Sequence, residues 1–221
     1  MNAPTGRRER KKAQTRKALA DAALELFLDR GYDQVGVKEV ADAADVSVTT
    51  LFKHFPCKEA LVFDLDQDIE AALVAAVRER APGVSVPQAL REHLLTAVGP
   101  HTLVLSPHTL IPPPPGEQTA GTRLAEFSRM VEETPALREY AHRMWMRHET
   151  ALARAIAEET GAPEGDAACA ALARFALNAP LLARSHPDPH RAANEIFALL
   201  ERGWGRAERP LTAPVPHRVD P

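Results

Sequence analysis

Residues 37–61, VKEVADAADVSVTTLFKHFPCKEAL, decide how the first part of the chain folds. Apolar residues recur at helical spacing twice in this stretch, first over residues 37–44 and again over residues 48–55. Helices this short are not stable alone, so they must pack against each other and on a longer helix. This order of elements predicts a helix-turn-helix, whose second helix can enter the major groove of DNA.

Local signals set the ends of the two short helices. Gly36 is an acceptable N-cap for the first, and Ser47 is a better one for the second because its hydroxyl accepts a backbone hydrogen bond. Pro56 ends the second helix, since the residue before a proline is pushed out of helical geometry. Small or basic side chains lie away from the apolar stripe of this helix, which favours contact with phosphates and base edges: Thr49, Thr50, Lys53 and His54.

Positive charge is concentrated just before this stretch. Residues 1–20 hold seven Lys or Arg against one acid, although the whole chain has a net charge of −3. A basic head on an acidic body indicates that only the head meets a polyanion. Residues 1–12 lack apolar periodicity and are predicted to form a flexible basic arm, and a long helix is predicted from about Ala13 to Arg30, with Gly31 after its end.

The rest of the chain is also predicted to be helical, with helices over about residues 86–98, 122–131, 135–160, 167–183 and 189–206. A long fourth helix opens at residues 56–59, and the proline-rich residues 99–118 form a surface loop, with a lid over a cavity as the alternative. No strand is predicted. We expect an all-α fold of about nine helices, divided into an arm (1–12), a helix-turn-helix domain (13–57), a helical ligand-binding and dimerisation domain (58–208) and a disordered tail (209–221).

The order and spacing of these features resemble the N-terminal DNA-binding region of the TetR family of transcriptional regulators. The resemblance covers roughly residues 13–65 and includes the Gly-Tyr that follows the long helix and the ending Phe-x-x-Phe-Pro-x-Lys-Glu-x-Leu. The sequence departs from the family at four positions. Asp45 stands where the family usually has a turn glycine, and Thr49 stands where it often has a glycine or another small or polar residue. Phe52 stands where many members have a tyrosine that contacts phosphate, and Cys57 stands where a serine caps the next helix.

The resemblance and the positions of the side chains together assign roles on the DNA-binding surface. Base edges are predicted to be contacted by residues near the N-termini of the two short helices, namely Lys38, Thr49 and Thr50. Phosphates are predicted to be contacted by basic residues at the rim, namely Lys53, His54 and Lys58. Two more residues, Ser47 and Phe52, are predicted to flank the surface. The alternative is an ordinary helical corner without a nucleic-acid partner.

The helix predicted over residues 167–183 is apolar almost all round, so it needs cover on both sides, and a twofold copy of the chain would supply it. The family resemblance implies a homodimer formed by the last two helices. Such a dimer presents two reading helices to a palindrome about 34–36 Å apart. The predicted interface residues are Leu172, Leu181, Ile196, Phe197, Leu200 and Trp204.

The resemblance also implies a small-molecule effector in the C-terminal domain that changes DNA affinity by favouring one of two conformations. Polar, aromatic and thioether groups on inward stripes suggest a mostly apolar effector. Core packing is the alternative for each candidate. The candidates are Phe127, Met130, Trp145, His148, Phe175 and Asn178.

Other function classes lack a signal. There is no glycine-rich phosphate loop, GxSxG or HExxH motif, and Cys57 and Cys169 form no metal-binding pair, so neither catalysis nor a metal or other cofactor is predicted. No apolar run is long enough for a membrane span, and a reduced, cytoplasmic protein is expected. Together with the family resemblance, the sequence thus predicts a ligand-responsive transcriptional repressor that binds a palindromic operator as a homodimer. The alternative is a TetR-like ligand-binding or interaction protein that has lost specific operator recognition.

Overall fold

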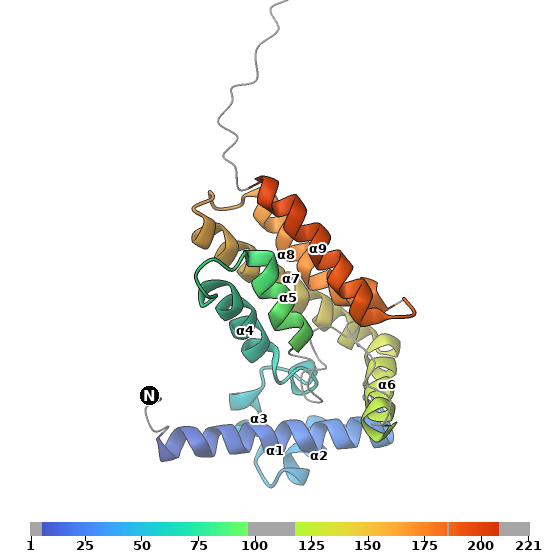
Figure 1. Cartoon of the computed structure of the whole chain (residues 1–221). Helices are drawn as coiled ribbons and strands as arrows, with labels where there is room; N and C mark the ends of the chain where they lie inside the picture. The colour runs from blue at the N-terminus through green and yellow to red at the C-terminus, as the bar shows by residue number, and fades with distance from the viewer. Residues whose placement is uncertain (1–5, 97–117, 185, 208–221) are drawn as a thin grey trace, which may run out of the picture. The chain divides into compact units, whose positions relative to one another are not determined.

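The computed structural model describes residues 6–96, 118–184 and 186–207, which form nine α-helices, one short 3-10 helix and no strand (Figure 1). The predicted all-α class with about nine helices is confirmed. Residues 99–117 of the predicted loop and the predicted tail lie outside the described residues. The helices are α1 (Arg7–Arg30), α2 (Val37–Ala43), α3 (Val48–His54), η1 (Glu59–Leu61), α4 (Asp66–Arg78), α5 (Val86–Thr96), α6 (Gln118–Glu133), α7 (Pro135–Thr160), α8 (Ala167–Arg184) and α9 (Pro189–Ala207).

The described residues belong to two compact units. The first unit holds residues 6–69 and 118–145, and the second holds residues 70–96 and 146–207. Helices α4 and α7 contribute residues to both units. The helix-turn-helix lies wholly within the first unit, and helices α5, α8 and α9 lie wholly within the second. The domain boundaries expected from the sequence stay predictions.

Helix α1 begins earlier than predicted, at Arg7 instead of near Ala13. The prediction relied on the missing apolar periodicity of residues 7–12. Lys, Arg, Glu and Gln have high helix propensity, however, and can extend a helix that is already formed without burying a face. Residues 6–14 are all exposed. Residues 7–12 are therefore a basic, exposed helical segment instead of part of a flexible arm.

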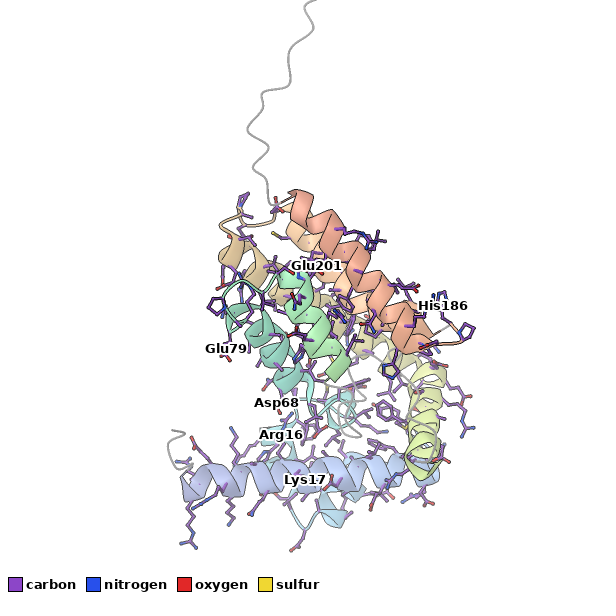
Figure 2. The ribbon with its side chains drawn as sticks, viewed as in Figure 1. Arg16, Lys17, Asp68, Glu79, His186 and Glu201 are labelled. Carbon is purple, nitrogen blue, oxygen red and sulfur yellow. The ribbon has the colours of Figure 1, made fainter. Side chains whose placement is uncertain are left out.

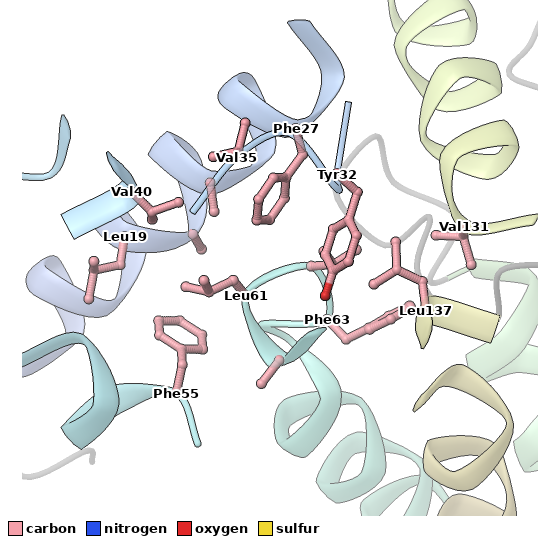
Figure 3. Packing of buried hydrophobic residues seen from close by; sticks show 14 of the residues in the cluster. Leu19, Phe27, Tyr32, Val35, Val40, Phe55, Leu61, Phe63, Val131 and Leu137 are labelled. Atoms are coloured by element: carbon pink, nitrogen blue, oxygen red, sulfur yellow. The ribbon is translucent and has the colours of Figure 1, made fainter. Parts of the chain in front are cut away.

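The core of the first unit is built on one face of α1. Leu19 and Phe27 lie eight residues apart on this face and are at most 1% exposed. Val40 of α2, Leu51 of α3 and Phe55 just after α3 are fully buried in the same cluster (Figure 3). Because α2 and α3 have only seven residues each, this burial is what stabilises them.

The link from α1 to α2 is closed by a carboxylate. Gly31 ends α1 with a positive φ of 88°, and Gly36 is the N-cap of α2 as predicted. The Glu39 carboxylate accepts a hydrogen bond from the Gly36 N–H at 2.8 Å and pairs with Arg30 at 2.7 Å. These two contacts, the N–H first, lower the pKa of Glu39. One side chain therefore fastens the last turn of α1 to the first turn of α2.

The turn between α2 and α3 is closed without a glycine. Asp45 has a φ of 54°, and it is the one residue other than glycine with a positive φ among those described. The Val46 N–H donates to the Ala41 carbonyl at 2.9 Å, which completes the turn. A side chain with a Cβ is strained in this left-handed conformation, although Asp tolerates it better than most residues.

The predicted fourth helix is interrupted, which corrects the prediction of one long helix from residues 56–59. The chain first forms η1, then turns, and α4 starts only at Asp66. All four residues 60–63 are buried, and a continuous α-helix could not turn four consecutive side chains towards the same core. Phe63 stacks on Tyr140 with ring centroids 5.4 Å apart and meets Phe127 edge-on at 6.4 Å.

The second unit follows the predicted helices closely. Helices α5, α7, α8 and α9 begin at the predicted residues, whereas α6 in the first unit is longer than the predicted span of 122–131. Helix α9 packs on both α8 and α5. Arg91 of α5 donates to the Asn194 side chain of α9 at 2.8 Å, and Ala183 and Ala193 are fully buried between the helices. Small side chains allow this close approach.

Replacing Asp45 with glycine is expected to stabilise the first unit. Glycine removes the strain of the positive φ, and this gain exceeds the added entropy of the unfolded chain, so Asp45→Gly should raise the free energy of unfolding by about 0.5–1 kcal/mol. Thermal unfolding followed by circular dichroism measures the change. Asp45→Ala is the matched control and should lower the unfolding temperature. Equal effects of the two substitutions would contradict the explanation.

Candidate nucleic-acid interface

The start of α3 is stabilised by its N-cap, Ser47. The Ser47 hydroxyl accepts a hydrogen bond from the Thr50 N–H at 3.1 Å, and the two hydroxyls lie 2.9 Å apart. Leu51 and Phe55 are fully buried on the opposite side of the helix. Ser47 is therefore a structural cap in addition to a predicted flanking residue, and half-buried Thr50 shares its hydroxyl with that cap.

Three neighbouring side chains of α3 face solvent: Thr49, Phe52 and Lys53. They combine a hydroxyl, an aromatic ring and an ammonium group on one surface. Phe52 is 48% exposed, so its ring is available to a partner on this face. It lacks a hydroxyl to donate to phosphate, but an apolar ring can contact a thymine methyl group or a deoxyribose.

Lys38 is exposed near the start of α2. Its ammonium pairs with the Asp42 carboxylate one turn later, at 2.7 Å. Both side chains are mostly exposed, so the pair is weak, and a DNA phosphate or base edge can compete with Asp42 for the ammonium. The structure thus leaves the Lys38 side chain accessible to solvent, which the predicted base contact requires.

His54, the last residue of α3, is half-buried. Its Nδ1 atom is buried without a hydrogen-bond partner among the described residues. Burial and the nearby charges of Lys12 and Arg16 lower the pKa of His54 below its usual value. The imidazole of the chain without DNA is therefore mostly neutral at pH 7.

Lys58 is engaged within the chain. Its ammonium donates to the Tyr32 carbonyl at 2.6 Å and lies 4.0 Å from the centroid of the Tyr32 ring and 5.4 Å from that of Phe27. Burial lowers the pKa of Lys58. These contacts tie η1 to the end of α1 and favour a structural role over the predicted phosphate contact. Spacing alone could not show this, because the partner lies 26 residues away.

Two groups of cations close to α3 were not among the predicted site residues. The first is the exposed helical segment of residues 7–12, whose five basic side chains surround a single acid. The second is Arg16, which is half-buried and contacts residues on both sides of Phe55. The charge count of residues 1–20 indicated the first group. No local pattern distinguishes Arg16 from its exposed neighbours.

The predicted effector residues do not gather in one unit. Phe127, Met130 and Trp145 belong to the first unit, and the other three belong to the second. Phe127 is buried against Phe63, which is the alternative of core packing. Phe175 is 54% exposed and so does not lie on an inward stripe.

The two polar effector candidates also find contacts within the chain. The Asn178 side chain donates to the Arg174 carbonyl at 2.7 Å, one turn earlier in α8, so no ligand is needed to satisfy it. His148 is fully buried in α7. The hydrogen bond from Asn178 to the Arg174 carbonyl therefore removes the reason for which Asn178 was predicted to contact a ligand.

The predicted dimer residues are placed differently from what the periodicity suggested. Leu172 and Phe197 are buried in the second unit, and Leu181, Ile196 and Leu200 are half-buried. The side chain of Trp204 lies outside the described residues. Three other large apolar side chains of α8 and α9 are exposed by more than half: Phe175, Leu182 and Leu199. The exposed apolar side chains of these two helices are therefore different from the predicted interface residues.

The structure adds two findings about other kinds of site. Within the described residues, no group of three potential ligands could hold a metal ion, and no helix is long and apolar enough to cross a membrane. Cys57 and Cys169 are free thiols, and burial raises the pKa of both. Cys57 is half-buried at the N-terminal side of η1, where the family resemblance led us to expect a capping serine.

Known proteins are similar in sequence to this chain, both in the helix-turn-helix region and over a longer stretch. The family described as "Bacterial regulatory proteins, tetR family" matches residues 19–65. The transcriptional regulator TcmR of Streptomyces glaucescens is 32% identical over 156 residues, which are 71% of this chain and 65% of that protein. The transcriptional activator FasR of Mycolicibacterium smegmatis is 42% identical over 64 residues, or 29% of each protein. The chain thus spans less than two thirds of these curated relatives.

Solved structures share the fold. The structure of GusR from Salmonella enterica superposes with a TM-score of 0.50 at 20% identity, covering 85% of this chain and 94% of that chain. At this identity the likeness concerns the fold alone. The family match begins at Leu19, the first buried residue of α1, and ends directly before α4, so it contains the whole helix-turn-helix and its supporting core. Residues 19–65 therefore form a helix-turn-helix domain of the kind found in the TetR family of bacterial regulatory proteins.

Proposed function

We propose that this chain is a cytoplasmic, ligand-responsive transcriptional repressor that binds a palindromic DNA operator as a homodimer and is modulated by a small, mostly apolar effector. The family consists of transcriptional regulators and not of enzymes, and the chain carries its helix-turn-helix. One relative, FasR, is named as an activator, so a reporter gene placed behind the operator must test the direction of regulation.

The observation that carries the proposal is the two-sided construction of α3. One side is anchored in the core through Leu51 and Phe55, while Thr49, Phe52 and Lys53 face solvent on the other. A short helix with a rigid inner face and a free polar face suits the major groove. The basic segment of residues 7–12 adds cations that favour a polyanion.

The alternative, a relative that has lost operator recognition, was motivated by the departures from the family pattern. The turn keeps its hydrogen bond between Val46 and Ala41 although Asp45 replaces glycine. Ser47 caps α3 normally. The departure that changes the exposed surface is Phe52, which exchanges a polar contact for an apolar one. These features support retained DNA binding with altered contacts.

Two further parts of the proposal have different support. Phe175 and Leu182 lie seven residues apart on one face of α8, Leu199 lies on α9, and all three are exposed. They support a homodimer, because a second copy of the chain would cover large apolar side chains that are otherwise in water. These three residues replace the predicted set of interface residues in the proposal. Effector binding is proposed from the family match alone, without an assignment of the residues that would line the site.

Selection of bound fragments from random-sequence DNA tests operator recognition directly. We expect the wild-type chain to enrich a palindrome and to bind that selected operator more tightly than random duplex. A variant with alanine at Lys38, Thr49, Thr50 and Lys53 should lose the preference, because it removes the polar groups that are predicted to contact base edges and phosphates. Absence of any enriched sequence would refute the proposed function, and an unchanged preference in the variant would refute the assigned surface.

The salt dependence of binding separates Lys53 from Lys58. Removing a phosphate contact lowers the slope of log K against log salt by about 0.9, so Lys53→Met should reduce the slope by roughly this amount. Lys58→Met should leave the slope unchanged and lower the unfolding temperature, because its ammonium binds the Tyr32 carbonyl. Fluorescence anisotropy with the selected operator measures both slopes. A lower slope in the Lys58 variant would restore its phosphate role.

Sedimentation of variants at the exposed apolar residues of α8 and α9 tests the dimer. The double variant Phe175→Ser, Leu199→Ser should shift the chain from dimer to monomer, because it removes two large apolar groups from the proposed interface. Met146→Ser is the matched control, since Met146 is an exposed apolar residue on α7 instead of on α8 or α9, and it should leave the dimer intact. A monomeric wild-type chain, or a double variant that stays dimeric, would contradict the interface.

A further inference from the structure

Arg16 makes three contacts around the end of α3. Its Nη1 atom donates to the carbonyl of His54 at 3.0 Å, and its Nη2 atom donates to the carbonyl of Asp64. Its guanidinium carbon lies 4.5 Å from the centroid of the Phe55 ring. Arg16 extends from the middle of α1, next to the mostly exposed Lys17 (Figure 2). A single side chain therefore joins α1, the end of α3 and the segment that leads into α4.

These contacts meet a specific need of α3. The last carbonyls of a helix have no partner within it, and a seven-residue helix has few internal bonds to fix its direction. A guanidinium at the C-terminal end also interacts favourably with the helix dipole. Its planar fork can donate to two separate acceptors, which the compact ammonium group of lysine cannot reproduce.

We infer that Arg16 is a positioning residue for operator recognition: it fixes the direction of α3 through the carbonyl of its last residue, without contacting DNA itself. This inference rests on the proposed DNA-binding function. Two of the five N–H donors of Arg16 are bound to carbonyls of the chain, and the side chain is half-buried. These contacts hold the guanidinium against the protein, in contrast to the exposed basic side chains of residues 7–12.

The inference separates Arg16 from its neighbour in a binding experiment. Arg16→Met removes both hydrogen bonds but keeps an unbranched apolar side chain, Arg16→Lys keeps the charge but not the fork, and Lys17→Met is the matched control for the loss of one positive charge. Each full-length variant is titrated by fluorescence anisotropy against the selected operator and against random duplex, at several salt concentrations. Hydrogen exchange of residues 48–64 is measured without DNA.

Both Arg16 variants are expected to weaken operator binding about tenfold or more, the effect of losing a charge-assisted hydrogen bond. For Arg16→Met, binding to random duplex and the salt slope should match those of Lys17→Met, whereas Arg16→Lys should keep the wild-type values of both. Amides of residues 48–64 should exchange faster in the Arg16 variants, while the rest of the chain keeps its protection. The specificity ratio therefore falls although the charge is retained in Arg16→Lys.

Other outcomes would overturn the inference. Equal weakening on both DNAs with a slope lower by about 0.9, rescued by Arg16→Lys, would make Arg16 a phosphate contact. Unchanged operator affinity in the folded variants would reduce its role to stability alone. A wild-type chain that binds no operator would refute the proposed function. Faster exchange of residues 48–64 in the Arg16 variants would then still support the role of Arg16 in holding α3 in place. Unchanged exchange would refute that role, whatever the outcome of the DNA titrations.

Discussion

Helices α2 and α3 have seven residues each, so neither forms enough internal hydrogen bonds to offset the cost of starting a helix in water. Both are ordered by the apolar face of α1, where Leu19 and Phe27 receive Val40, Leu51 and Phe55. A fully buried side chain of this size contributes about 1.5–3 kcal/mol relative to its exposed state. The exposed surface of α3 therefore has its shape because the opposite side is fixed in this core.

The second support of α3 is polar and comes from its two ends. Ser47 satisfies a backbone N–H at the start, and Arg16 satisfies the carbonyl of the last residue. Between these ends the side chains alternate between core and solvent, which leaves Thr49, Phe52 and Lys53 together on one face. Apolar burial fixes the depth of the helix, and the polar contacts at its ends restrict its rotation. Such rigid presentation lowers the entropic cost of binding.

Features encoded by neighbouring residues could be predicted from the sequence. Gly36, Ser47 and Pro56 place the ends of α2 and α3 by local backbone chemistry, and the 3.6-residue repeat shows which face of these helices is apolar. The same repeat placed the starts of α7 and α9 correctly. The exposed polar face of α3 could be predicted for the same reason, whereas its contact with DNA stays a prediction.

Features decided by distant residues could not be predicted. The break before α4 follows from the rings of Tyr140 and Phe127 around Phe63, and the inward turn of Lys58 follows from the Tyr32 carbonyl. In α8, residues on all sides are apolar, so the repeat could not show that Phe175 is exposed. Periodicity identifies a stripe only when the opposite face is polar.

The bonds of Arg16 go to carbonyl oxygens, which every amino acid possesses. The side chain at position 54 can therefore change without loss of that contact, and the same holds for the exposed residues one turn earlier. Mutations on the exposed face of α3 leave the contacts that hold the helix intact. Under the proposed function, a gene duplicate acquires a new operator through a few substitutions on this face, while the residues that position the helix are inherited unchanged.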